Sequence, residues 1–326
     1  MENSSINKAA EGVKYWLQWQ VVVCALIFIL PTAIAIRLGL LRKKGDLVDP
    51  ADLWATCWKN LHPRWLLIYR AFAFLAMALL LYDTVAAFGF FVFFFYTQWT
   101  FTLVMVYFAL ATIVSVRGCS IHVSENTQTR EKDRFLENDS EGIKYGTELA
   151  SKEKESKVFV KLEQVNHVST PIKELGFLEI FLLIVYQTCA GAVMLTDIVF
   201  WCLLLPFMTD ENFQLTLMIG CMHSVNAVVL ILESALNRLV KPFSWFGLIY
   251  FVMWSCAYVV FQWVLHACYF TWWPYPFLDL STPWAPIWYL ALALVHIPCY
   301  GLYVLLTKSK HAVLSRLFSQ TFVRLD

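Results

Sequence analysis

Long, uninterrupted apolar runs constrain this chain more than any other feature of its sequence. There are seven of them, and each is about 20 residues or longer, which matches the thickness of a bilayer rather than an ordinary core helix. Hydrophobic residues make up 59% of the 326 residues and charged residues only 15%, against about 25% charged in soluble domains. In hydrocarbon, a helix satisfies all its backbone polar groups within one segment. The sequence therefore predicts an all-α membrane protein, a bundle of about seven transmembrane helices.

The positions of the runs divide the chain into segments. We expect spans at residues 17–36, 65–87, 91–116, 175–206, 213–236, 243–270 and 284–306. The resulting segments are an N-terminal piece (1–16), helices one to three (17–116), a long polar loop (117–173), helices four to seven (174–306) and a tail (307–326). The first piece is too polar and too long for a cleavable signal peptide, so the first span should be retained.

Three features of this scheme lead to specific predictions. The second and third runs are nearly continuous, and Gly89 is the expected turn between them. The fourth run is longer than a bilayer requires, so it should tilt or protrude. The loop 117–173 mixes both signs of charge with few large apolar residues, so we expect it to be mostly disordered.

The basic residues predict the orientation. Lys8 and Lys14 are the only ones on the N-terminal side of the spans and Arg70 lies inside a run, so the opposite side holds 22 of the 25 Lys and Arg residues. Cytoplasmic loops carry the excess of Lys and Arg. We therefore expect a non-cytoplasmic N-terminus and a cytoplasmic C-terminus, in an endomembrane such as the endoplasmic reticulum or in the plasma membrane.

Composition also bounds the partners. A net charge of +1 gives no basic field for nucleic acid. The nine cysteines form no Cys-x-x-Cys pair and no Cys/His ligand spacing, so we predict neither a metal site nor a cofactor. Membrane lipids are the expected partners.

Polar side chains inside the runs are few, and each one costs about 2.5 kcal/mol or more at the centre of a span, so each requires a partner or a function. The fifth run is the richest. It holds His223, Asn226, Glu233 and Asn237 at spacings that place all four on one stripe of a helix. Such a stripe should face the interior of the bundle.

Thr97 and His223 are expected to meet in the non-cytoplasmic half. At about 1.5 Å per residue, they would lie about 9 Å and about 15 Å deep from the same side. Histidine is the usual base that activates a hydroxyl nucleophile, although a buried threonine more often bonds only its own backbone. We expect the walls of this site to include Asp83, Asn226, Glu233, His266, Tyr275 and Asp279.

Three sequence pieces resemble the androgen-induced / rolling-stone-like family of membrane proteins over residues 65–306. They are Phe95-Tyr96-Thr97 with Val106-Tyr107-Phe108, Met222-His223 with Glu233 ten residues on, and Trp273-Pro274-Tyr275-Pro276-Phe277-Leu278-Asp279 preceded by His266.

Characterised animal members of that family hydrolyse fatty acid esters of hydroxy fatty acids with a membrane-embedded threonine and a histidine. The resemblance implies Thr97 as nucleophile, with Thr100 and Thr102 as alternatives, and His223 as base. This chain has Gly220 where those enzymes have a further histidine, and it adds an N-terminal span and the long loop.

Two other functions fit a seven-span chain. One is a non-enzymatic receptor, scaffold or lipid-binding protein, although the chain has no helix-end Asp-Arg-Tyr and no Asn-Pro-x-x-Tyr. The other is a transporter or channel, which the lack of an internal repeat disfavours.

Overall fold

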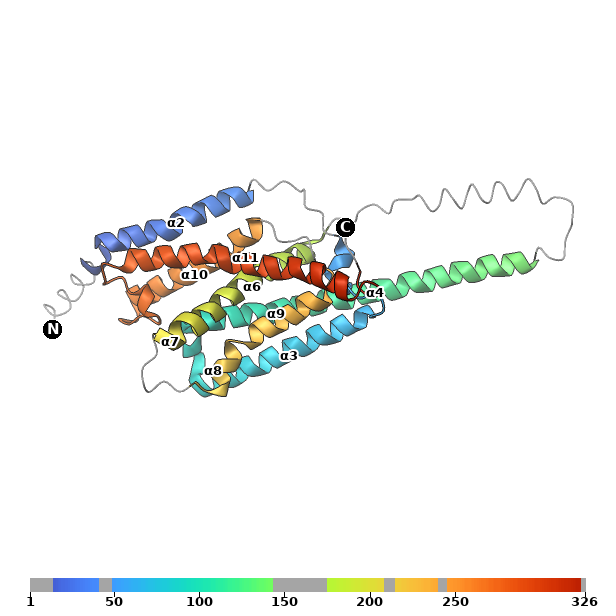
Figure 1. Cartoon of the computed structure of the whole chain (residues 1–326), viewed down its shortest axis with the longest axis horizontal. Coiled ribbons are helices and arrows are strands. Elements are labelled where there is room, and N and C mark those ends of the chain that lie inside the picture. Colours follow the sequence, from blue (N-terminus) through green and yellow to red (C-terminus); the bar gives the residue numbers. More distant parts are fainter. Residues whose placement is uncertain (1–13, 41–48, 143–174, 208–214, 240–244, 324–326) are drawn as a thin grey trace.

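The computed structural model describes residues 14–40, 49–142, 175–207, 215–239 and 245–323. This part of the chain is built from helices, which run lengthwise in one bundle (Figure 1). The α-helices are α2 (Trp19–Leu40), α3 (Pro63–Phe88), α4 (Tyr96–Gly142), α6 (Phe177–Val199), α7 (Leu205–Phe207), α8 (Leu217–Met222), α9 (Val225–Leu236), α10 (Trp245–Cys268) and α11 (Ala285–Leu317). Short 3₁₀ turns η1 (Pro50–Leu53), η2 (Gly89–Phe94) and η5 (Pro276–Leu278) and the π turn η4 (Phe200–Leu204) complete them.

Seven helical stretches are long and apolar enough to cross a membrane, as the sequence predicts. The second and seventh stretches, residues 63–94 and 285–317, are longer than the expected spans. The fourth stretch, residues 177–207, has 31 residues, about 46 Å at about 1.5 Å per residue. This exceeds the roughly 30 Å of a bilayer core. The protein is therefore a multi-pass integral membrane protein by the length and composition of its helices.

The turn between the second and third spans lies at Gly89, as predicted. α3 begins at Pro63, where the side chain of His62 accepts the backbone N–H of Arg64. It ends at Phe88, because Gly89 has a φ of 69°. Side chains with a Cβ rarely adopt this conformation, so glycine is the residue that allows the chain to reverse here.

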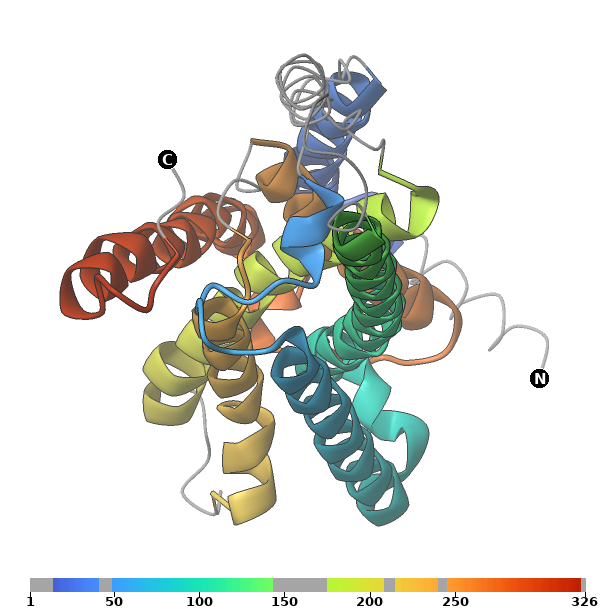
Figure 2. The same ribbon diagram turned by 90° about the vertical axis from the view of Figure 1, so that its right-hand side faces the viewer.

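α6 forms the centre of the bundle. It contacts α4, α9, α10 and α11 and crosses the middle of the molecule when the bundle is seen end-on (Figure 2). Small residues make this possible, since at Gly191 the ring of Phe251 in α10 occupies the space that a Cβ would need. Close approach of helices at small residues is the usual packing mode inside membranes.

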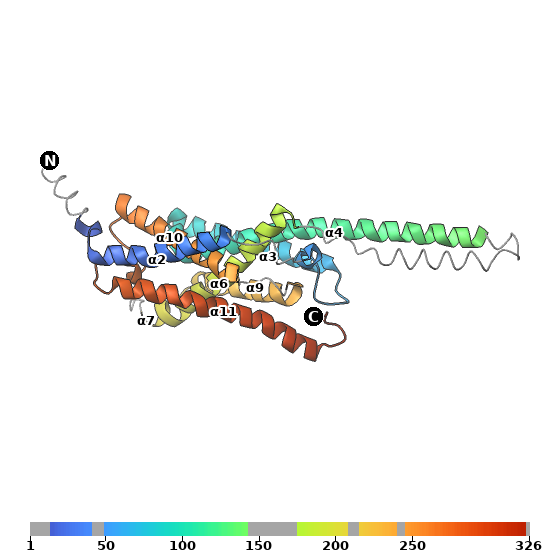
Figure 3. The same cartoon turned by 90° about the horizontal axis from the view of Figure 1, so that it is seen from above.

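α2, the first span, is peripheral. It packs along α10 and α11 and lies between them in the view of Figure 3, and much of its apolar surface is exposed. In a membrane protein this surface faces lipid.

The two ends of the bundle differ in chemistry. We call the end with residues 49–62, 237–239 and 310–323 the basic end, and the end with residues 89–95 and 269–284 the aromatic end. Stacked and edge-to-face rings fill the aromatic end, including Phe94 with Phe270 and Trp272.

At the basic end, the segment before α3 and the C-terminal part of α11 close off α9. The last carbonyls of α9, at residues 234–237, accept hydrogen bonds from Lys310, Trp58 and Cys57. A helix end needs such partners when it is buried.

Two segments beyond the expected spans are more helical than the sequence predicts. α4 continues to Gly142, into the loop for which we expected disorder, and residues 143–174 lie outside the described residues. α11 continues to Leu317, into the expected tail. Extending a helix that the membrane has already nucleated costs far less than starting a new one, and Lys310 buries its side chain against α9.

Candidate functional site

The predicted stripe on the fifth span is interrupted by a break in the helix. α8 ends at Met222 and α9 begins at Val225, so His223 and Ser224 lie between them with non-helical backbone. The side chain of Asn226 donates to the carbonyl of Met222 (3.1 Å), and the indole of Trp201 donates to the carbonyl of His223 (2.9 Å). Irregular backbone at membrane depth requires such partners or a lined cavity.

A second irregularity faces this break. α6 passes into the π turn η4 at Phe200, and π turns occur often at functional sites. The ring of Phe200 stacks on the ring of His223, with centroids 3.5 Å apart and planes 5° apart. The stack fixes the plane of the imidazole. Its Nδ1 is buried and has no hydrogen-bond partner in the described ranges of the chain.

Thr97 and His223 line the same two cavities, together with Tyr275. The first cavity, of about 90 Å³, lies between α4, α6, α10 and α11. The second, of about 460 Å³, lies toward α3 and α8. Both side chains are more than nine-tenths buried, at 7% exposed for Thr97 and 8% for His223. Thr97 and His223, which the sequence predicts to meet, therefore both line these two cavities.

Thr97 lies in the first turn of α4, where backbone N–H groups have no partner within the helix. The hydroxyl of Tyr275 accepts the N–H of Tyr96 (3.1 Å). Burial raises the pKa of Tyr275 to about 12, although the neighbouring polar groups of Thr97 and Tyr96 oppose the shift. The phenol therefore keeps its proton at physiological pH.

The alternatives for the nucleophile lie elsewhere. Thr100 accepts a hydrogen bond from Thr196 (3.1 Å), and neither Thr100 nor Thr102 is among the residues that line the two cavities. Of the three candidate threonines, Thr97 is the one at the cavity wall.

Five predicted wall residues do not line these two cavities. Asp83 is exposed on α3. Asn226 is fully buried and bridges the helix break. His266 stacks on Trp273 at the aromatic end (4.1 Å between centroids). Asp279 accepts the N–H and the hydroxyl of Ser281 (both 2.9 Å) and shapes the loop.

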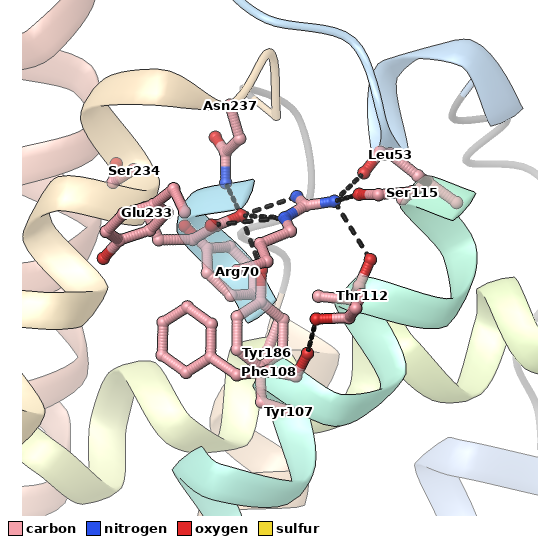
Figure 4. A network of polar contacts seen from close by, with 12 residues as sticks. Leu53, Arg70, Tyr107, Phe108, Thr112, Ser115, Tyr186, Glu233, Ser234 and Asn237 are labelled. Carbon is pink, nitrogen blue, oxygen red and sulfur yellow. Dashed lines mark hydrogen bonds and ion pairs between the residues drawn. The ribbon is translucent and has the colours of Figure 1, made fainter. Parts of the chain in front are cut away.

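Glu233, the fifth, belongs to a separate buried network nearer the basic end (Figure 4). It pairs with Arg70 at 2.6 Å, and both side chains are 0% exposed. The hydroxyl of Tyr107 and the amide of Asn237 also donate to Glu233 (3.0 and 3.1 Å).

Arg70 is equally well satisfied. Its guanidinium donates to the hydroxyl of Ser115 (2.6 Å) and to the carbonyls of Leu53 (2.9 Å) and Ala111 (3.4 Å). A closed network of this kind stabilises the contact of α3, α4 and α9, and it leaves Glu233 without a free role in the cavities.

Ser255 and His296 also line the first cavity, and the sequence did not predict them as part of the site. An intramembrane histidine is itself a signal, but the sequence does not show which helix faces α11. The sequence did not predict Arg70 as the partner of Glu233. Arg70 lies in α3 and Glu233 in α9, so the two charges meet only when these helices pack together.

The described residues hold no group of three or more His, Cys, Asp or Glu side chains able to bind a metal ion. Comparisons with known protein families, with curated proteins and with solved structures found no match to this chain.

Proposed function

We propose that this membrane protein hydrolyses lipid esters inside the bilayer, with Thr97 as nucleophile and His223 as base, as the resemblance to the androgen-induced / rolling-stone-like family implies. The observation that carries the proposal is that both side chains line the same buried cavities. The walls are almost entirely apolar, so a lipid chain is the substrate that fits them.

The arrangement around Thr97 supports this chemistry. The oxygen of Tyr275 accepts the backbone N–H of Tyr96 at the start of α4, which leaves its own O–H as a donor. A protonated phenol beside the nucleophile is suited to stabilise the negative oxygen that forms on the ester carbonyl.

The reaction would proceed in two balanced steps. His223 takes the proton of Thr97 as the threonine oxygen attacks the acyl carbonyl, and the ester C–O bond then breaks as His223 gives that proton to the leaving alcohol. Water next attacks the acyl-threonine with His223 as base, which releases the fatty acid and restores the threonine hydroxyl.

Labelling by a fluorophosphonate probe tests the nucleophile, because such probes react with activated hydroxyl groups. Labelling of the purified full chain should be lost in Thr97→Ala and should persist in Thr102→Ala, a matched change outside the two cavities. His223→Ala should slow the hydrolysis of hydroxy-fatty-acid esters by about 10²–10⁴-fold. Equal labelling and turnover in all four proteins would exclude the mechanism.

A second function, lipid binding without catalysis, is favoured by one observation. Catalytic histidines are usually oriented by a third group, but Nδ1 of His223 has no hydrogen-bond partner among the described residues. Saturable binding of a lipid ester by a wild-type protein that neither labels nor turns over would establish this alternative.

A further inference from the structure

A third cavity continues the hollow interior toward α2. It has a volume of about 270 Å³ and lies between α2, α10 and α11. It shares wall residues with the first cavity, which in turn shares Thr97 and His223 with the second. The residues common to the first and third cavities are Ser255, Val259, Leu278, Leu292 and His296. The three hollows therefore adjoin one another in series across the bundle.

His296 stands at the junction of the first and third cavities and is 7% exposed. Its Nδ1 lies 2.6 Å from the carbonyl oxygen of Leu292, one turn earlier in α11. A carbonyl oxygen can only accept, so Nδ1 carries the proton and Nε2 of the neutral ring has a free lone pair. The ring is held against Phe251, with centroids 4.4 Å apart.

Nε2 of His296 has no hydrogen-bond partner within the part of the chain that the structure describes. Among the residues that line the third cavity, it is the one buried nitrogen or oxygen of a side chain in this condition. The neighbouring groups are satisfied, since Ser255 bonds with the hydroxyl of Tyr96 (2.8 Å), and Tyr289 donates to Leu278 (3.2 Å). A buried acceptor that receives no hydrogen bond in an apolar wall costs free energy. A hydrogen-bond donor on a ligand would recover that free energy.

We propose that His296 is the polar centre of a second binding site, which accepts a hydrogen bond from the hydroxyl group of a single-chain aliphatic lipid. The apolar walls hold the alkyl chain, and Nε2 selects an O–H donor over a group that only accepts. The site concerns binding alone, so it does not depend on whether Thr97 reacts.

Displacement of a photoreactive fatty-acid probe from the full chain in lipid nanodiscs tests this site. The competitors are a secondary octadecanol, the octadecanone with oxygen at the same carbon, and octadecane. None contains an ester, so hydrolysis cannot alter the result. Wild-type protein should bind the alcohol about fivefold to tenfold more tightly than the ketone, as expected for one neutral hydrogen bond.

His296→Phe keeps a ring against Phe251 and removes the acceptor, so it should bind alcohol and ketone equally. The matched control is His266→Phe, the same change outside the three cavities, which should keep the preference. Equal binding of alcohol and ketone by the wild type, or a preference that survives in His296→Phe, would overturn the proposal. The first comparison needs no variant, so it decides the matter even if His296→Phe does not fold.

Discussion

At the scale of single residues, Arg70 and Glu233 form an ion pair that is buried within the bundle. These two charges have 0% exposure and are tolerated because neighbouring groups form hydrogen bonds with both of them. Replacing both members of a buried ion pair by apolar residues often changes the stability of a protein little. Removing one member leaves an unpaired charge in the protein interior, which lowers stability.

Arg70→Met should therefore lower the free energy of unfolding by about 3–5 kcal/mol. The control is Arg238→Met, which removes the partner of Asp52 in a pair that is 34% and 26% exposed and should cost less than about 1 kcal/mol. Thermal unfolding of the purified proteins in detergent measures both. Similar losses in the two variants would show that the buried network does not stabilise the fold.

The double variant Arg70→Met with Glu233→Leu should be less destabilised than Arg70→Met alone, because it leaves no unpaired charge. A larger loss of stability in the double variant would mean that the carboxylate of Glu233 stabilises the network mainly as the acceptor for Tyr107 and Asn237, rather than as the partner of Arg70.

At the scale of elements, the close packing of α6 against its neighbours determines how the helices are arranged. Two helical glycines illustrate this through the space around the position of a Cβ atom. At Gly191 the ring of Phe251 fills the space, whereas at Gly301 in α11 no atom lies within 4 Å. The same substitution should consequently have opposite effects at the two positions.

Gly191→Ala should lower the melting temperature, because the added methyl group separates α6 from α10. Gly301→Ala should raise stability by about 0.5–1 kcal/mol, the helix propensity difference between the two residues. Melting curves measured side by side compare them. A stable Gly191→Ala protein would contradict the close contact.

At the scale of the whole molecule, charge asymmetry predicts the orientation. The basic end should be cytoplasmic and the aromatic end should lie on the opposite side. Epitope tags at the two termini should become accessible from opposite sides of the membrane. They can be probed in intact cells, after selective permeabilisation of the plasma membrane, and after permeabilisation of all membranes.

The same orientation places the sequon at Asn138 in the cytoplasm and the one at Asn3 outside. Asn138 should never carry a glycan. Glycosylation of Asn138, or two tags accessible from one side, would reverse the assignment or change the number of spans.

Much of the fold was predictable from the sequence, because spans depend on local properties. The length of each apolar run, the turn at Gly89 and the seven helices follow from the need to satisfy backbone groups in hydrocarbon. The polar stripe of the fifth span was only partly right: periodicity placed Glu233 and Asn237 together correctly, but it assumed an unbroken helix through His223.

The amino-acid sequence by itself determined the class of protein, the number of membrane-spanning stretches and the scarce polar residues inside them. The tertiary structure decided which of those residues meet: Thr97 with His223 and Tyr275 at a cavity, Glu233 with Arg70, and His296 at a junction of two hollows. Span formation is governed by the few residues of one helix and the bilayer. Side-chain partners are chosen by the packing of several helices, which no local pattern encodes.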